Sequence, residues 1–99
     1  MTHIDPDEHS LEYLQNTIQS AVNASQKVVV ATPSEFVGGK TAWTLSNGQT
    51  ILYHHAYVAL GIEGTGDQAA LDLYNPWGHA HVKVPLAELK NVILFLDID

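Results

Sequence analysis

Residues 50–62 read TILYHHAYVALGI, residues 63–67 read EGTGD, and residues 69–75 read AALDLYN. The first segment contains the β-branched and aromatic residues that favour strands, and the glycine-rich segment after it favours a turn. The third segment is predicted to be the second strand. It ends before Pro76, because proline cannot donate a hydrogen bond to a strand ladder. This stretch therefore predicts an antiparallel hairpin, and the hairpin decides the fold.

The sequence on either side of the hairpin predicts one helix and several more strands. Asp5 to Glu8 is a helix-start signal, and apolar residues then recur at helical spacing at Leu11, Leu14, Ile18 and Val22. Further strands are expected at residues 27–32, 41–45, 81–84 and 92–98, with a loop at 34–40, a turn at 47–48 and a helical turn at 85–89. One helix followed by antiparallel strands predicts an α+β domain over residues 10–99, after a flexible segment at residues 1–9.

Composition excludes several classes of function. The chain has 99 residues with 4 Lys, no Arg and a formal net charge of −7, which argues against nucleic acid and against anionic membrane surfaces as partners. It has no Cys, so it contains no disulfide, no thiolate zinc site and no thiol nucleophile. No segment approaches the roughly 18 apolar residues of a membrane helix, and no signal peptide is recognisable. If Met1 is the native start, the expected location is the cytoplasm; otherwise the location is open.

The hairpin predicts a contact between a histidine and an asparagine. If the turn is centred on Thr65, His55 lies directly opposite Asn75 on the facing strand. We expect His55 to donate its Nδ1–H to the asparagine, which leaves Nε2 free to exchange a proton with a nucleophile. These are two members of a Cys-His-Asn triad. The same register pairs Val58 with Asp72 and Ile62 with Gln68.

Alternation along the first strand predicts which side chains face the core. His55, Tyr57 and Ala59 share one face of the strand. The other face is predicted to be the core face, and it carries His54, Ala56, Val58, Leu60 and Ile62. Of these residues, His54 lies near the end of the strand.

Two short motifs resemble the calpain family of cysteine proteases. Residues 55–61, HAYVALG, resemble the His-Ala-Tyr-…-Gly segment that carries the family's catalytic histidine, and residues 75–78, NPWG, are the same as the segment that carries its catalytic asparagine. The resemblance implies that His55 and Asn75 are catalytic and that Trp77 covers the bond between them. The order of elements extends the likeness to residues 10–98, one lobe of a two-lobed enzyme. It implies a papain-like C-terminal lobe, with the N-terminal helix on a small twisted antiparallel sheet, partly closed like a barrel.

Two departures from the family leave alternatives open. The residue before the histidine is Gly in most of the family and His54 here, so either His54 or His55 could be the catalytic one; motif and register favour His55, with His54 as a supporting residue. The family's nucleophilic Cys lies on the N-terminal lobe, together with a Gln that helps form the oxyanion hole, and this chain has neither lobe nor Cys. We therefore expect part of a cysteine peptidase, inactive alone, whose partner is a Cys-bearing lobe or a peptide substrate, and which self-associates through its exposed interface. The alternatives are a non-catalytic binding or regulatory module of the same fold, or a small domain with accidental motif matches.

Other candidate sites are weaker. Four histidines suggest zinc, but neither Cys nor a carboxylate pattern supports them: His54, His55, His79 and His81. Glu63 and Asp67 are too few for calcium, which takes six to eight oxygen ligands. The serines lack the sequence context of a nucleophile elbow; they are Ser10, Ser34 and Ser46. No metal and no cofactor is predicted.

Overall fold

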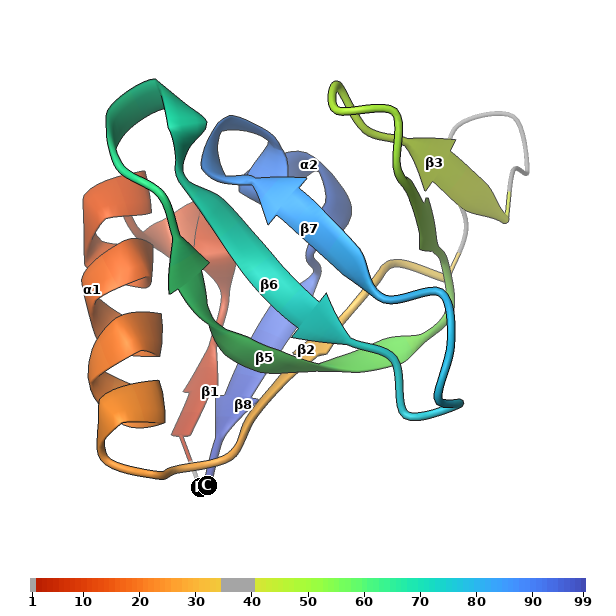
Figure 1. The fold of residues 1–99 in the computed structure, drawn as a ribbon. Coiled ribbons are helices and arrows are strands. Elements are labelled where there is room, and N and C mark those ends of the chain that lie inside the picture. Colours follow the sequence, from red (N-terminus) through yellow and green to blue (C-terminus); the bar gives the residue numbers. More distant parts are fainter. Residues whose placement is uncertain (1, 35–40) are drawn as a thin grey trace.

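The computed structural model describes residues 2–34 and 41–99, and Figure 1 shows their arrangement. The strands are β1 (Thr2–Ile4), β2 (Val28–Ala31), β3 (Ala42–Thr44), β4 (Thr50–Leu52), β5 (Ala56–Glu63), β6 (Ala70–Tyr74), β7 (Val82–Pro85) and β8 (Phe95–Ile98). The helices are α1 (Leu11–Asn23) and the short α2 (Leu89–Val92), with 3₁₀ turns at Pro6–Glu8, Gly66–Gln68 and Leu86–Glu88. Most of the predicted loop at 34–40 lies outside the described residues.

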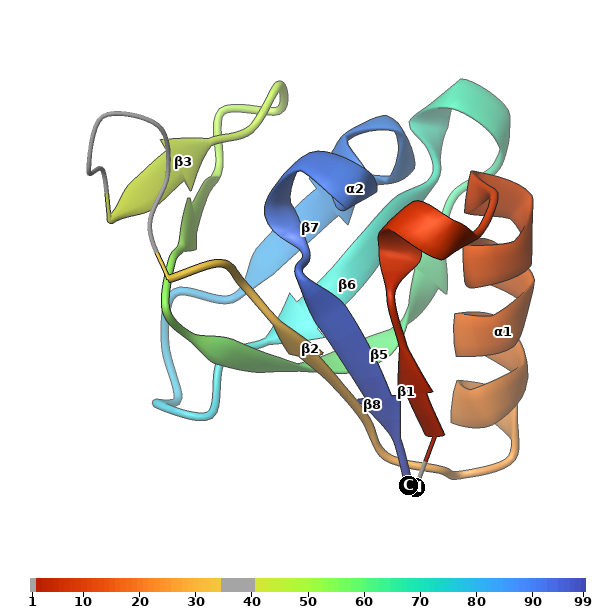
Figure 2. The ribbon, with the colours of Figure 1, turned by 180° about the vertical axis from the view of Figure 1, so that it is seen from behind.

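Six of the strands form one antiparallel sheet in the order β1-β8-β2-β5-β6-β7. Strands β3 and β4 form a separate hairpin around the predicted turn at Asn47 and Gly48. The expected α+β domain with an N-terminal helix and an antiparallel sheet is confirmed. The sheet is open, not closed into a barrel, because β1 and β7 are two separate edges (Figures 1 and 2).

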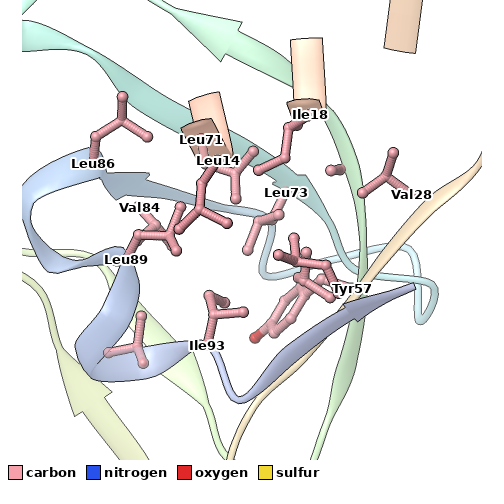
Figure 3. Close-up of a cluster of buried hydrophobic side chains, with 14 of the residues drawn as sticks. Leu14, Ile18, Val28, Tyr57, Leu71, Leu73, Val84, Leu86, Leu89 and Ile93 are labelled. Atoms are coloured by element: carbon pink, nitrogen blue, oxygen red, sulfur yellow. The ribbon is translucent and has the colours of Figure 1, made fainter. Parts of the chain in front are cut away.

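Helix α1 covers the sheet as its apolar spacing predicts. The Ser10 side chain caps the helix, because its Oγ accepts a hydrogen bond of 3.1 Å from the Tyr13 N–H. Leu14 and Ile18 are buried and point into the cluster that β5, β6 and β7 complete (Figure 3). Burial of this one face holds the helix on the sheet.

Residues 2–9, where the sequence predicts a flexible segment, include a strand that pairs within the sheet. Strand β1 pairs with β8, and His3 and Asp97 face each other with Nδ1 and Oδ1 2.6 Å apart. Ile4 is buried in the core. Seen from behind, β8 lies between β1 and β2, which places the two ends of the described chain side by side (Figure 2). A strand of three residues is too short to leave a periodic signal in the sequence.

The predicted strand at 50–62 is divided in two. His54 has a φ of +50°, in the left-handed region, and this bend separates β4 from β5. The predicted core face of β5 is also wrong: Tyr57 and Ala59 are buried, whereas Leu60 is 52% exposed. Apolar residues occur on both faces of this strand, so alternation separates the faces without showing which one the core takes.

The predicted register of the β5–β6 hairpin is wrong by two to three residues. Val58 pairs with Tyr74 instead of Asp72, and Ile62 pairs with Leu71 instead of Gln68. The connection contains the 3₁₀ turn Gly66–Gln68, which places its midpoint beyond Thr65, and a bulge between Ala59 and Gly61 shifts the register again. His55 lies one residue before the start of β5. Because of the shifted register, it is not directly opposite Asn75.

Candidate active site

His55 and Asn75 meet although they are not opposed in the ladder. His55 precedes β5, and Asn75 follows the last residue of the neighbouring β6. The His55 Nε2 and the Asn75 Oδ1 are 2.9 Å apart, within hydrogen-bonding distance. The imidazole is partly exposed, and the Asn75 side chain is fully buried. The structure thus brings together the two residues that the sequence singled out.

A main-chain donor fixes the direction of this hydrogen bond. The Trp77 N–H donates to the same Asn75 Oδ1 at 3.0 Å. Since a backbone N–H can only donate, the shared amide atom is the oxygen, and the His55 Nε2 must carry the proton that reaches it. The neutral imidazole of His55 then has an unprotonated Nδ1 as its free base.

The sequence-based prediction assigned the two nitrogens of His55 the other way round and is wrong on this point. That prediction assumed direct opposition of His55 and Asn75, with the near nitrogen of the ring facing the amide. His55 lies one residue before β5, so its ring reaches Asn75 through Nε2, the nitrogen farther from its own main chain. The nitrogen left for proton transfer is Nδ1.

The four residues from Asn75 to Gly78 form a turn that places an indole on the histidine. The Gly78 N–H donates to the Asn75 carbonyl at 2.9 Å, which closes the turn, and Gly78 has a φ of +85°. The Trp77 ring contacts the His55 ring edge to face, with centroids 4.3 Å apart. Tyr57 makes a second edge contact to His55, with centroids 4.9 Å apart. Trp77 is itself 64% exposed, so the partly exposed His55 ring lies against an exposed aromatic side chain, while Asn75 lies buried behind it.

Thr32 binds the main chain of His55 from the β2 side of β5, whereas Asn75 binds the imidazole from the β6 side. Its Oγ1 accepts from the His55 N–H at 3.0 Å and donates to the His55 carbonyl at 3.1 Å, and the Thr32 N–H donates to that carbonyl at 3.0 Å. Thr32 follows β2, which pairs with β5, and its side chain is buried. The sequence analysis did not predict this role for Thr32. The one feature that marks the residue in the sequence is its hydroxyl group, between the apolar strand β2 and Pro33.

His54 lies apart from the hydrogen bond between His55 and Asn75. Its side chain is exposed, and its N–H donates to the Pro33 carbonyl at 2.7 Å. Its positive φ is a conformation that glycine adopts without strain, which gives a physical reason for the glycine that the resembling family has at this position. Of the two candidate histidines, His55 is the one that contacts the asparagine.

The remaining candidate residues have other surroundings. His81 accepts a hydrogen bond from the Asn75 N–H, and His79 lies 6.4 Å from the Trp77 ring. Glu63 pairs with the Lys83 ammonium at 2.6 Å, and Asp67 is in an exposed 3₁₀ turn. Within residues 2–34 and 41–99 there is no group of three or more His, Asp or Glu side chains that could hold a metal ion.

The serines also have structural surroundings of their own. Ser10 caps α1, and the Ser46 hydroxyl donates to Glu88 at 2.6 Å. Ser34 lines an open hollow of about 400 Å³ next to His55. The other residues that line this hollow are mostly apolar: Ala31, Thr32, His54, His55, Ala56, Leu94 and Phe95. A ligand bound in the hollow contacts His55.

No known protein family matches the chain, and no curated protein or solved structure matches it significantly. None of the helices in the described part of the chain is long and apolar enough to cross a membrane. The argument for function therefore rests on the geometry of His55, Asn75 and Trp77 and on the short motifs that contain them.

Proposed function

We propose that this domain supplies the histidine and the asparagine of a Cys-His-Asn triad, as the C-terminal lobe of a calpain-like cysteine peptidase of papain-like fold. One observation carries the proposal: His55 donates its Nε2–H to an Asn75 oxygen whose orientation the Trp77 N–H fixes. A histidine held in this way has a defined free nitrogen, which is what a general base for a thiol requires.

In the proposed reaction, His55 Nδ1 takes the proton of a cysteine thiol on the other lobe. The thiolate attacks the peptide carbonyl, and the imidazolium then returns the proton to the leaving amine. Asn75 accepts from the Nε2–H throughout and keeps the ring in one tautomer. Trp77 shields that hydrogen bond on one side, since its ring lies against the His55 ring.

The chain contains no Cys, so hydrolysis requires a second lobe that provides the nucleophile. The lining of the hollow beside His55 is mostly apolar, and Leu94 within it is 52% exposed. These features support the proposal that the partner lobe and the peptide bind at this hollow. The alternative function, a binding or regulatory module without catalysis, uses the same hollow to hold a peptide that is not cleaved.

The test begins with the coding region upstream of Met1. If it encodes a lobe with a Gln followed by a Cys at the start of a helix, the longer product is expressed and its hydrolysis of casein is measured. We expect His55→Ala to lower kcat/KM by about 10³-fold or more, and Asn75→Ala to lower it by about 10- to 10³-fold. The control is His9→Ala, because His9 stacks on Tyr13 of α1 and has no contact with the site.

Two outcomes contradict the catalytic proposal. One is a longer product whose activity survives His55→Ala. The other is the absence of any Cys-bearing lobe in the encoded protein, which leaves the non-catalytic binding module as the function of the domain.

A further inference from the structure

We infer that His81 is a positioning residue for the His55–Asn75 pair, an inference that rests on the proposed function. The ladder between β6 and β7 runs from Ala70 opposite Pro85 to Leu73 opposite Val82. Asn75 lies two residues beyond this ladder. Its N–H donates instead to the Nδ1 of His81 at 2.9 Å, so that an imidazole replaces the missing strand partner.

The His81 ring is itself held in place. It stacks on Tyr74, with centroids 4.4 Å apart and an angle of 20° between the planes. Since the Asn75 N–H can only donate, the Nδ1 of His81 is unprotonated in this geometry and Nε2 carries the proton. In the described part of the chain His81 makes no ion pair, and its contacts are the Asn75 N–H and the Tyr74 ring. The orientation of the His81 ring therefore allows its Nδ1 to accept one hydrogen bond, which the Asn75 N–H donates.

Three hydrogen bonds meet at Asn75, and two of them connect His81 to His55 through it. His81 holds the Asn75 main chain, the Trp77 N–H holds the Asn75 side chain, and the Asn75 oxygen holds His55. The Asn75 side chain is fully buried, and a small displacement of its main chain moves the oxygen that His55 contacts. His81 thus acts on His55 through Asn75 and does not touch the reacting atoms.

The first measurement is made on the chain itself by ¹⁵N NMR spectroscopy. A scalar coupling across the hydrogen bond between the Asn75 amide nitrogen and the His81 Nδ1 is expected in the wild-type protein. If the coupling is absent, or if His81 carries its proton on Nδ1, the inference is overturned. This measurement needs no variant, so it stays decisive even if a substitution unfolds the domain.

The second measurement follows the His55 Nε2 proton. We expect His81→Ala to speed its exchange with water by about tenfold, as the loss of one hydrogen bond of ordinary strength implies. His81→Asn carries an acceptor oxygen at the place of Nδ1 and should restore slow exchange. The control His9→Ala changes a histidine that stacks on Tyr13 of α1, away from the site, and should have no effect. Unchanged exchange in folded His81→Ala contradicts the inference.

A third measurement separates the failure of this inference from the failure of the proposed function. In an active two-lobed product, we expect His81→Ala to lower kcat by about tenfold with KM within about twofold, and His81→Asn to recover most of the rate. If no peptidase activity exists while His81→Ala still loosens His55, the proposed function fails and the positioning role stands. If activity depends on His55 but not on His81, the positioning role fails alone.

Discussion

Replacing Thr32 with valine tests how the main chain of His55 is held. Valine has nearly the same shape as threonine and the same β-branched preference for extended backbone, so the change removes the hydroxyl and leaves no cavity. Thr32 is only 5% exposed, and its hydrogen bond with the His55 N–H is partly buried. The Thr32 N–H still satisfies the His55 carbonyl, so only the His55 N–H loses its acceptor.

The expected cost follows from that single orphaned donor. A buried donor left without a partner lowers the free energy of unfolding by about 1–3 kcal/mol. With a urea dependence of about 1.5 kcal/mol per molar, typical of a small domain, the midpoint falls by about 0.7–2 M. In a two-lobed product, the looser His55 also lowers the peptidase rate.

The assay is urea unfolding followed by circular dichroism, with Thr44→Val as the matched control. Thr44 is an exposed residue of β3, and its replacement should change stability by no more than about 0.5 kcal/mol. If Thr32→Val and Thr44→Val have the same midpoint, the hydroxyl does not hold His55 and the reasoning is refuted.

Three further predictions concern the surroundings of the same site. His54→Gly should stabilise the domain by up to about 1.5 kcal/mol in urea unfolding. The left-handed conformation costs a non-glycine residue about 1–2 kcal/mol, and glycine loses about 0.5–1 kcal/mol in chain entropy. A clear loss of stability contradicts this prediction. Burial raises the pKa of Tyr53 from 10.0 to about 12, so stability that is present below pH 10 should be lost as the pH rises from 10 towards 12. Urea unfolding across this pH range should show a smaller loss in Tyr53→Phe, and an equal loss in both proteins refutes the assignment. Trp77→Ala should speed exchange of the His55 Nε2 proton several-fold while changing stability by less than about 1 kcal/mol, because the indole is 64% exposed; unchanged exchange in NMR spectra shows that the indole does not shield the bond.

The elements that were predicted well have signals confined to a short stretch of chain. The helix at Leu11–Asn23 was predicted from its apolar spacing, whereas the predicted start signal at Asp5 to Glu8 belongs to a separate 3₁₀ turn and the cap is Ser10. The strand Val28–Ala31 is an apolar run that ends near Pro33. The turn at Asn47 and Gly48 has the residue pair that tight hairpins prefer. In each case the local preference and the packing of the whole domain favour the same structure.

The features that were missed depend on contacts between distant parts of the chain. Strand β1 exists because β8 offers it a partner 94 residues away, where His3 meets Asp97. The register of β5 depends on a bulge next to Gly61 and on a 3₁₀ turn, neither of which alternation of apolar residues can reveal. The core face of β5 carries the buried Tyr57, whose hydroxyl accepts the N–H of Leu52 from the preceding strand β4.

The contacts of Thr32 and His81 with the pair were missed for a related reason, although His81 had been considered as a zinc ligand. Each binds a main-chain group of a catalytic candidate, and a main-chain donor leaves no mark in the sequence. His55 and Asn75 were found despite a wrong register because the motifs identified them independently of the pairing. The motifs therefore located the pair, and the structure showed which other residues support it.

The motif at residues 75–78 has a physical explanation that does not depend on family membership. Asparagine at the first position of a turn accepts the N–H two residues on, proline suits the second position, and glycine adopts the positive φ of the fourth. The third residue, Trp77, then donates the N–H that orients the amide and places its ring on His55. The turn chemistry and the orientation of the histidine are thus one arrangement, because the turn orients the Asn75 oxygen that accepts the His55 Nε2–H.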